Sequence, residues 1–520
     1  MSEVTARISA GYAFAGPALR LGAVVHDGAC DPAAQVRIPL SMLNRHGLIA
    51  GATGTGKTKT LQLLAEQLSE QGVAVFAADV KGDLSGLATP GELTEKVAAR
   101  SAEVGDAWAP TAYPTEFFTL GGGPVGGSVG GGVDGIPLRA TMTSFGPVLL
   151  AKVLGLNETQ ESSLGLMFHW ADRAGLPLLD LKDLRAVITW LTSEAGKPEL
   201  RGLGGVSTAT AGVILRELVG LENDGADVFF GEPEFDTADL MRTAADGRGI
   251  ISCLELEGLQ DRPTLFSTFL MWVLADLFDA LPEIGDADKP KLVVFLDEAH
   301  LLFRNASDAF LEAVTQTVRM IRSKGVGVFF VTQNPGDLPD AVLAQLGNRI
   351  QHGLRAFTPD DADALRKTVR TYPSTADYDL EEALTGLGIG EAVVTVMSER
   401  GAPTPVAWIR LPAPRSRMAP SEGAVRQQVV AASGLHARYA DAVDRDSAYE
   451  RLAARVNAPP PPPAPAPRKD SAPTRGTRRG TAQEDPSVVT QILDSGAFKS
   501  FMRSAGSALG RTLFGTRRRR

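Results

Sequence analysis

Residues 46–60 read HGLIAGATGTGKTKT, and within them Gly51 to Thr58 fit the pattern G-x-x-x-x-G-K-[ST] at every position. Glycines in such a loop let backbone N–H groups turn inward around a phosphate. The ammonium group of Lys57 can reach the β- and γ-phosphates of a nucleotide, and the hydroxyl of Thr58 can ligate Mg²⁺. The predicted phosphate-binding residues are Gly51, Ala52, Thr53, Gly54, Thr55, Gly56, Lys57 and Thr58.

The residues on either side of this loop support the interpretation. Apolar residues 48–50 predict a strand that enters the loop, and the helical spacing of apolar residues in 61–71 predicts a helix that leaves it. The alternative is a glycine-rich turn that binds no ligand, and the flanking strand and helix disfavour that alternative.

A second motif, KLVVFLDEAHLLF at 291–303, indicates which kind of nucleotide-binding protein this is. An apolar run such as 292–296 is typical of a buried parallel strand, and ligands bind at the carboxyl ends of such strands. We predict that Asp297 holds Mg²⁺ through water and that Glu298 polarises the attacking water as general base. A switch GTPase would lack this glutamate. A solvated acidic turn is the alternative, and the phosphate-binding loop disfavours it.

The remaining apolar runs predict strands at 73–83, 249–256 and 325–333, with mainly helices from about 140 to 245. The first of these strands ends in Asp79-Val80-Lys81. Along the chain, the strand at 249–256 thus lies between the strand that starts at Val73 and the strand at 292–296, which precedes Asp297 and Glu298. This order is typical of P-loop proteins with an additional strand and a catalytic glutamate. Asp79 and Lys81 lie at the carboxyl end of the strand that starts at Val73, and either a structural salt link or a catalytic role suits the pair. Gln333 ends the last strand. Its amide either contacts the γ-phosphate or the attacking water, or caps nearby backbone.

Composition bounds the class of protein. The chain has 520 residues, of which 44% are hydrophobic, and these values suit a soluble globular protein of one large domain or two. Residues 457–520 hold 12 Lys/Arg and 4 Asp/Glu, a net charge of +8, so the other residues carry −17 and the whole chain −9. An acidic main part gives no general case for a nucleic-acid binder.

The compartment is predicted from cysteines and apolar segments. Cys30 and Cys253 are the two cysteines, and they show no metal-binding spacing, which favours a reducing compartment. The N-terminus lacks a basic start followed by an apolar core, so it is no signal peptide. The most apolar long segment, 265–281, contains two aspartates and reads as a buried helix rather than a membrane span. We expect a cytoplasmic protein without a transmembrane segment.

The tail has its own composition. Residues 458–480 are rich in Pro, Ala and Arg and cannot bury enough apolar surface to fold. Helical spacing then returns after 486, and the chain ends in four arginines, Arg517 to Arg520. Docking on a neighbouring subunit is the favoured role for that helix, with an anionic membrane, nucleic acid or plain solvation as alternatives, and the four arginines are left unassigned.

The sequence thus predicts an α/β fold with several segments. These are a small β-rich segment (1–46), the first part of a P-loop ATPase core (47–120), a glycine-rich loop and helical insertion (121–248), the second part of the core (249–412), a C-terminal helical extension (413–456), a Pro/Arg linker (457–485) and an amphipathic helix with a basic end (486–520).

Five stretches together resemble one superfamily. They are NRHGLIAGATGTGKT (44–58), DVKGDLSGL (79–87), DKPKLVVFLDEAHLLF (288–303), VRMIRSKGVGVFFVTQNPGDLPDAVLAQLGNRIQHGLRAFTPDD (318–361) and GIGEAVVTVM (388–397). From about Asn44 to Pro412 the chain resembles the HerA–FtsK superfamily of P-loop ATPases, and more closely the YjgR-like bacterial proteins.

This resemblance implies a RecA-like core with a mainly parallel sheet, Mg²⁺-dependent ATP hydrolysis and a hexameric ring. It also implies a glutamine at the sensor position, which Gln333 matches, and arginines that complete the site from a neighbouring subunit. Arg322 matches the basic residue before the fifth strand in FtsK-type pumps, and the further candidates are Arg319, Arg349 and Arg355. Two kinds of substrate remain open for such a motor, namely DNA and a protein partner that it remodels or gates. A nucleotide-dependent assembly protein with little turnover is a third reading, which the complete set of Lys57, Asp297 and Glu298 disfavours.

Overall fold

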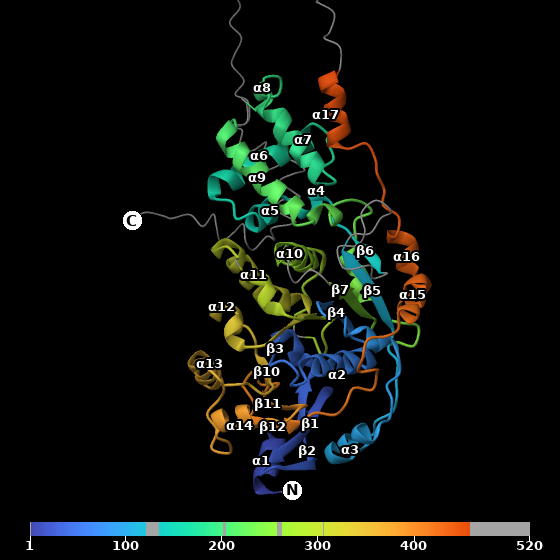
Figure 1. Ribbon diagram of the computed structural model, residues 1–520, viewed down its shortest axis with the longest axis vertical. Helices are drawn as coiled ribbons and strands as arrows, with labels where there is room; N and C mark the ends of the chain where they lie inside the picture. Colours follow the sequence, from blue (N-terminus) through green and yellow to red (C-terminus); the bar gives the residue numbers. More distant parts are fainter. Residues whose placement is uncertain are drawn as a thin grey trace, which may run out of the picture.

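The computed structural model describes residues 2–120, 135–200, 204–256, 263–285, 287–304 and 306–457. These residues form one sheet of twelve strands, in the order β2-β1-β12-β11-β10-β3-β9-β8-β4-β7-β5-β6. The sheet runs from the N-terminal strands at one end of the molecule to its middle, and a cluster of helices lies at the other end (Figure 1).

The eight strands from β10 to β6 are parallel to one another. They are β10 (Asn348–Gln351), β3 (Gly47–Ala50), β9 (Val326–Thr332), β8 (Leu292–Leu296), β4 (Ala74–Asp79), β7 (Ile251–Glu255), β5 (Thr115–Leu120) and β6 (Ile136–Leu138). Apart from Arg349, all their residues are buried, which explains their nearly continuous apolar runs. The strands expected at 73–83, 249–256, 292–296 and 325–333 are present, and the first of them ends at Asp79 rather than Lys81.

The order of these strands in the sheet differs from their order along the chain. The strand between the P-loop strand β3 and the Asp-Glu strand β8 is β9. The strand expected at 249–256, which is β7, instead pairs with the far side of β4. The carboxyl ends of β3, β9, β8 and β4 therefore lie next to one another at one edge of the sheet.

The other end of the sheet is antiparallel. It contains β1 (Ala18–His26), β2 (Ala29–Pro39), β11 (Glu391–Thr395) and β12 (Ala407–Arg410). The strands expected in the first 46 residues are thus present, and β1 joins the main sheet through β12. A short helix, α1 (Glu3–Ala10), precedes them, and the hydroxyl of Ser2 caps its first turn by accepting from the N–H of Thr5 at 3.1 Å.

Helices cover the parallel strands. Helix α2 (Lys57–Glu70) packs on β3 and β4, and α11 (Asp308–Ile321) packs on β9. The segment expected as a buried helix is α10 (Pro263–Ala280), whose Trp272 is among the largest fully buried side chains. Within the ranges that the structure describes, no helix is both long enough and apolar enough to span a membrane.

Six helices between 142 and 223 form the cluster at the upper end of Figure 1. They are α4 (Met142–Phe145), α5 (Pro147–Val153), α6 (Glu158–Arg173), α7 (Leu181–Thr192), α8 (Lys197–Leu200) and α9 (Thr208–Asn223), as the helical pattern of this region predicts. Side chains cap several of them. In α7, for example, Asp180 and Asp183 form a reciprocal capping box.

The C-terminal extension returns to this cluster. It contains α15 (Gly423–Ala432), α16 (Gly434–Tyr439) and α17 (Ala448–Asn457), and α17 lies against α7 (Figure 1). The buried carboxylate of Asp183 accepts hydrogen bonds from the Ser447 hydroxyl and from the N–H of Tyr449. The expected glycine-rich loop, Pro/Arg linker, amphipathic helix and terminal arginines lie outside the described residues, apart from Gly135 and Asn457.

Candidate nucleotide-binding site

The loop between β3 and α2 has the backbone that its glycines predict. Gly51 has φ +152° and Gly54 has φ +81°, conformations that residues with a side chain rarely adopt. At Gly51 a side chain is also excluded by contact, because an added Cβ would lie 2.5 Å from the Cβ of His352. Helix α2 begins at Lys57, so the N–H groups of its first turn point toward the loop.

Lys57 folds back over this loop. Its Nζ atom donates to the carbonyl oxygen of Gly51 at 2.7 Å and to that of Ala52 at 3.3 Å. Burial, followed by the positive charge of Lys81, lowers the pKa of Lys57, while the charges of Glu298 and Asp297 act in the opposite direction. An ammonium group has three donors, so one is left for a phosphate in the loop.

Asp297 and Glu298 follow β8 at the same edge of the sheet. Burial raises the pKa of the Asp297 carboxyl to about 6, which marks a site where a nearby cation would stabilise the carboxylate. Glu298 is buried and has a left-handed backbone with φ +48°. Its Oε1 atom contacts the Nζ atom of Lys81, and its Oε2 atom lies 3.3 Å from the Nδ1 atom of His300.

Lys81 forms its ion pair with Glu298 and not with Asp79, the partner that the sequence suggests. The Asp79 carboxylate accepts from three backbone N–H groups in the turn after β4, one of which is the N–H of Lys81 at 3.1 Å. The Lys81 ammonium instead pairs with Glu298. Burial raises the pKa of Glu298, but the hydrogen bond and charge of Lys81 outweigh burial, so the pKa lies below its ordinary value.

Gln333 lies directly beside the phosphate-binding loop. The N–H of Gly51 donates to the carbonyl oxygens of Thr332 and Gln333, at 3.3 and 3.2 Å. The side chain of Gln333 is exposed and forms no hydrogen bond with any residue that the structure describes, so the backbone-capping alternative is not supported. The turn that follows is held by the Asp337 carboxylate, which accepts from the Thr332 hydroxyl at 2.8 Å and the N–H of Asn334 at 2.9 Å.

His352, which no motif identified, holds the other side of the loop. Its N–H donates to the carbonyl oxygen of Ala50 at 2.7 Å, extending the pairing of β10 with β3. Its Nδ1 atom lies 2.8 Å from the carbonyl oxygen of Glu391, which can only accept, so Nδ1 carries the proton. Its Nε2 atom then accepts from the Thr60 hydroxyl in α2, at 2.8 Å. A lone histidine after a strand carries no sequence signal for this role.

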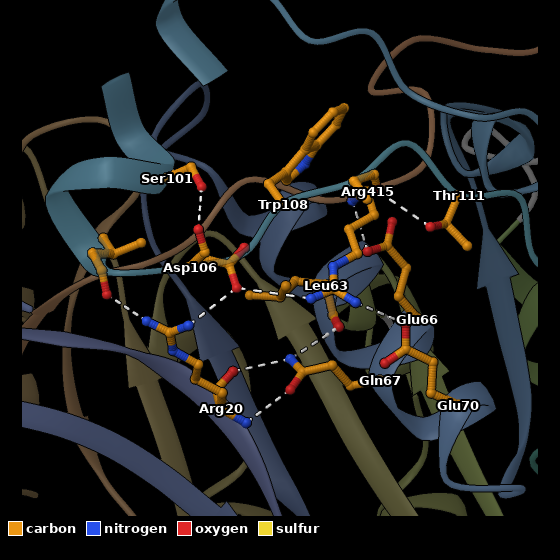
Figure 2. Close-up of polar contacts among 12 residues, drawn as sticks. Arg20, Leu63, Glu66, Gln67, Glu70, Ser101, Asp106, Trp108, Thr111 and Arg415 are labelled. Atoms are coloured by element: carbon orange, nitrogen blue, oxygen red, sulfur yellow. Dashed lines mark hydrogen bonds and ion pairs between the residues drawn. The ribbon is translucent and has the colours of Figure 1, made fainter. Parts of the chain in front are cut away.

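Helix α2 is anchored along its length as well (Figure 2). The amide of Gln67 forms two hydrogen bonds with the backbone of Arg20 in β1, at 2.8 and 2.9 Å. The buried carboxylate of Glu66 accepts from the N–H groups of Arg415 and Ser416, both at 2.9 Å. The Arg20 guanidinium continues the network to Asp106 at 3.0 Å. The helix that begins at the phosphate-binding loop is thereby attached to the antiparallel strands and to the segment after β12.

The four candidate arginines occupy different environments. Arg349, in β10, donates to the carbonyl oxygens of Thr371 at 3.0 Å and Leu343 at 3.4 Å, which is a structural role within its own chain. Arg319 and Arg355 are exposed, whereas Arg322 is partly buried at the end of α11. These contacts of Arg349 set it apart from the exposed Arg319 and Arg355.

Comparison with known proteins agrees with this geometry. A family model described as Helicase HerA-like C-terminal matches residues 26–520. The DNA double-strand break repair helicase HerA of Saccharolobus solfataricus is 21% identical over 370 residues, which are 69% of this chain and 63% of that relative. The chain thus matches less than two thirds of that helicase's length.

Solved structures share the fold. The bacterial conjugative coupling protein TrwBdeltaN70, in its unbound monoclinic form, has a TM-score of 0.52 at 15% identity and covers 80% of this chain and 93% of its own. The plasmid coupling protein TrwB in complex with ADP and Mg²⁺ has a TM-score of 0.50 at 16% identity, covering 79% and 98%. The fold is therefore that of the RecA-like P-loop NTPases, and the chain belongs to the Helicase HerA-like C-terminal family, within the HerA–FtsK superfamily of P-loop ATPases.

Proposed function

We propose that this protein binds Mg-ATP in the loop Gly51–Thr58 and hydrolyses it with Glu298 as general base. The observation that carries the proposal is the meeting of this loop with Asp297, Glu298 and Gln333 at adjacent strand ends of one sheet edge. Family membership supports the same reaction, and TrwB, which shares the fold, has been crystallised with ADP and Mg²⁺.

The residues present fit Mg²⁺. The hydroxyl of Thr58 and the carboxylate of Asp297 are oxygen ligands, which this cation prefers, and burial raises the pKa of Asp297 although the charge of Lys81 acts to lower it. The described residues contain no group of three or more His, Cys, Asp or Glu that could hold a metal. Nucleotide sites hold Mg²⁺ through one or two protein oxygens together with phosphates and water. When bound, the cation would neutralise charge on the phosphates.

Each side chain then has one task in hydrolysis. The Oε2 atom of Glu298, which lies 3.3 Å from the Nδ1 atom of His300, can accept the proton of the attacking water. Lys57 stabilises the negative charge on the phosphates, and Gln333 contacts the γ-phosphate or the water. An arginine of a neighbouring subunit in a ring, expected to be a hexamer, would stabilise the charge of the transition state. Arg319, Arg322 and Arg355 are the candidates for that role, and Arg349 is disfavoured by its contacts within the chain.

We further propose that duplex DNA is the substrate that the ATPase moves along. The support is the family description together with the name of its HerA relative, a DNA repair helicase. A protein partner is the second candidate. The helical cluster from 142 to 223, against which α17 packs, offers a surface for such a partner.

Phosphate release from ATP tests this proposal. The parent protein should release phosphate with Mg²⁺ and not with excess EDTA, and duplex DNA should raise the rate. Lys57→Ala is the matched control, and it should lose both nucleotide binding and release. Turnover that DNA leaves unchanged would instead favour the protein partner. A parent protein without turnover in Mg²⁺, with or without DNA, would contradict the assignment as an ATPase.

A further inference from the structure

The general base has a cationic neighbour from another strand. The Nζ atom of Lys81 pairs with the Oε1 atom of Glu298. The two partners differ in burial, because 36% of the Lys81 side chain is exposed but only 8% of the Glu298 side chain. The other carboxylate oxygen of Glu298, Oε2, lies 3.3 Å from the Nδ1 atom of His300, so the carboxylate keeps a second contact when the lysine moves away.

Two neighbouring turns of the fold hold Lys81 and Glu298 next to each other. Strands β4 and β8 are parallel neighbours with Ala78 opposite Leu296, so the turns after them lie side by side. In the first turn, the Asp79 carboxylate accepts from the N–H groups of Lys81, Gly82 and Leu84 at 3.1, 2.9 and 2.8 Å. In the second turn, the left-handed backbone of Glu298 aims its side chain; few residues other than glycine adopt this conformation.

Pairing with an ammonium group changes what the carboxylate can do. The negative charge is shared by both carboxylate oxygens, so a cation bound to Oε1 also reduces the charge on Oε2. A base with less negative charge removes a proton from water more slowly. The cation also restricts rotation of the carboxylate about its last bond.

We propose that Lys81 is a positioning residue that restrains Glu298 and limits the basal rate of ATP hydrolysis. The inference rests on the proposed function, since it concerns the general base of that reaction. Anything that draws the exposed Lys81 ammonium away from Glu298 raises the rate, so the pair is a point at which a bound partner can stimulate turnover.

Lys81→Met tests this, because methionine keeps the length of the side chain and removes its charge. We expect kcat without any partner to rise by about three- to ten-fold, a small part of the 10²–10⁴ that a general base supplies. KM and the affinity for a fluorescent ATP analogue should change little. Lys81→Arg restores a cation and should bring kcat back toward the parent value. Lys96→Met removes an exposed lysine of helix α3 (Glu95–Val104) and serves as the matched control.

The outcomes separate the inference from the proposed function. If the parent hydrolyses ATP and Lys81→Met has an equal or lower kcat, the inference is wrong and the proposed function stands. If neither protein hydrolyses ATP, the proposed function fails and the inference fails with it.

Melting temperatures of nucleotide-free protein give a readout that does not depend on turnover. Lys81→Met and Glu298→Gln should each lower the melting temperature, and the double variant should lower it by less than the sum. Strictly additive changes would overturn the pairing in solution.

Discussion

The Nε2 atom of His352 accepts a hydrogen bond from the hydroxyl of Thr60, 2.8 Å away, one turn into the helix that leaves the phosphate-binding loop. The same ring donates from Nδ1 to the carbonyl oxygen of Glu391. This histidine therefore connects the loop helix to the antiparallel part of the sheet. The contact with Thr60 needs the neutral ring, because a protonated Nε2 cannot accept a hydrogen bond.

Acid should weaken this connection. Burial lowers the pKa of His352 from 6.5 to about 4, so between these values the unfolded chain binds a proton that the native protein excludes. The contribution of His352 to stability is thus complete above pH 6.5 and falls as the pH falls toward 4. The loss from pH 6.5 to pH 5 amounts to about 2 kcal/mol.

His352→Gln removes this titration, so melting temperatures measured from pH 7 to pH 5 should fall less steeply for the variant than for the parent. His46 is also buried with its pKa lowered to about 4, and it contributes the same slope to both proteins. Parallel curves for parent and variant would show that His352 is not held neutral.

A methyl group at Gly51 should disrupt the loop. Gly51→Ala forces a Cβ into a left-handed backbone and to 2.5 Å from the Cβ of His352, so we expect lower stability and loss of ATP-analogue binding. Gly220→Ala is the control, because it lies in α9 with no atom within 4 Å of the added Cβ and should stabilise by about 0.5–1 kcal/mol. Calorimetry and a binding titration measure both effects. Unchanged binding by Gly51→Ala would contradict the loop geometry.

Replacing Glu66 in α2 should lower the stability of the protein more than replacing Glu70, one turn further along the same helix. Glu66→Ala removes the acceptor of two backbone N–H groups, that of Arg415 and the buried one of Ser416. The free energy of unfolding should fall by about 2–4 kcal/mol as a result. Glu70→Ala removes contacts from a carboxylate whose side chain is 33% exposed, and should cost less. Thermal unfolding of the two variants compares them, and equal losses would show that the Glu66 contacts (Figure 2) do not hold the helix.

Mixed oligomers test whether an arginine acts on a neighbouring subunit. Alanine at the acting residue among Arg319, Arg322 and Arg355 should abolish hydrolysis, and so should Glu298→Gln. Mixing these two inactive proteins should restore part of the activity, because some sites then combine an intact glutamate with an intact arginine. Arg349→Ala should lower stability instead, since its contacts lie within the chain. A failure of all three mixtures would argue against a shared site.

Sequence alone predicted the residues that lie in contiguous motifs. Local spacing within about fifteen residues is enough to identify such motifs. They are the phosphate-binding loop, the Asp297–Glu298 pair and the central strands. The roles of His352 and Lys81 depend on which strands become neighbours, and no local pattern carries that information. For the same reason, the sequence suggests Asp79 as the partner of Lys81. In the structure, the Asp79 carboxylate instead accepts from backbone N–H groups of its turn. The neighbouring strand β8 brings Glu298 next to Lys81, and these two side chains form the pair.

The most direct test of the account compares ATP binding with ATP hydrolysis in Glu298→Gln. The amide keeps the size of the side chain but cannot accept the proton of the attacking water. A single preparation of parent and variant would be titrated with a fluorescent ATP analogue and assayed for phosphate release in Mg²⁺. The account predicts that the variant binds at least as tightly as the parent and that its kcat falls by at least about a hundred-fold. A variant that turns over at the parent rate would contradict the assignment of Glu298 as the general base.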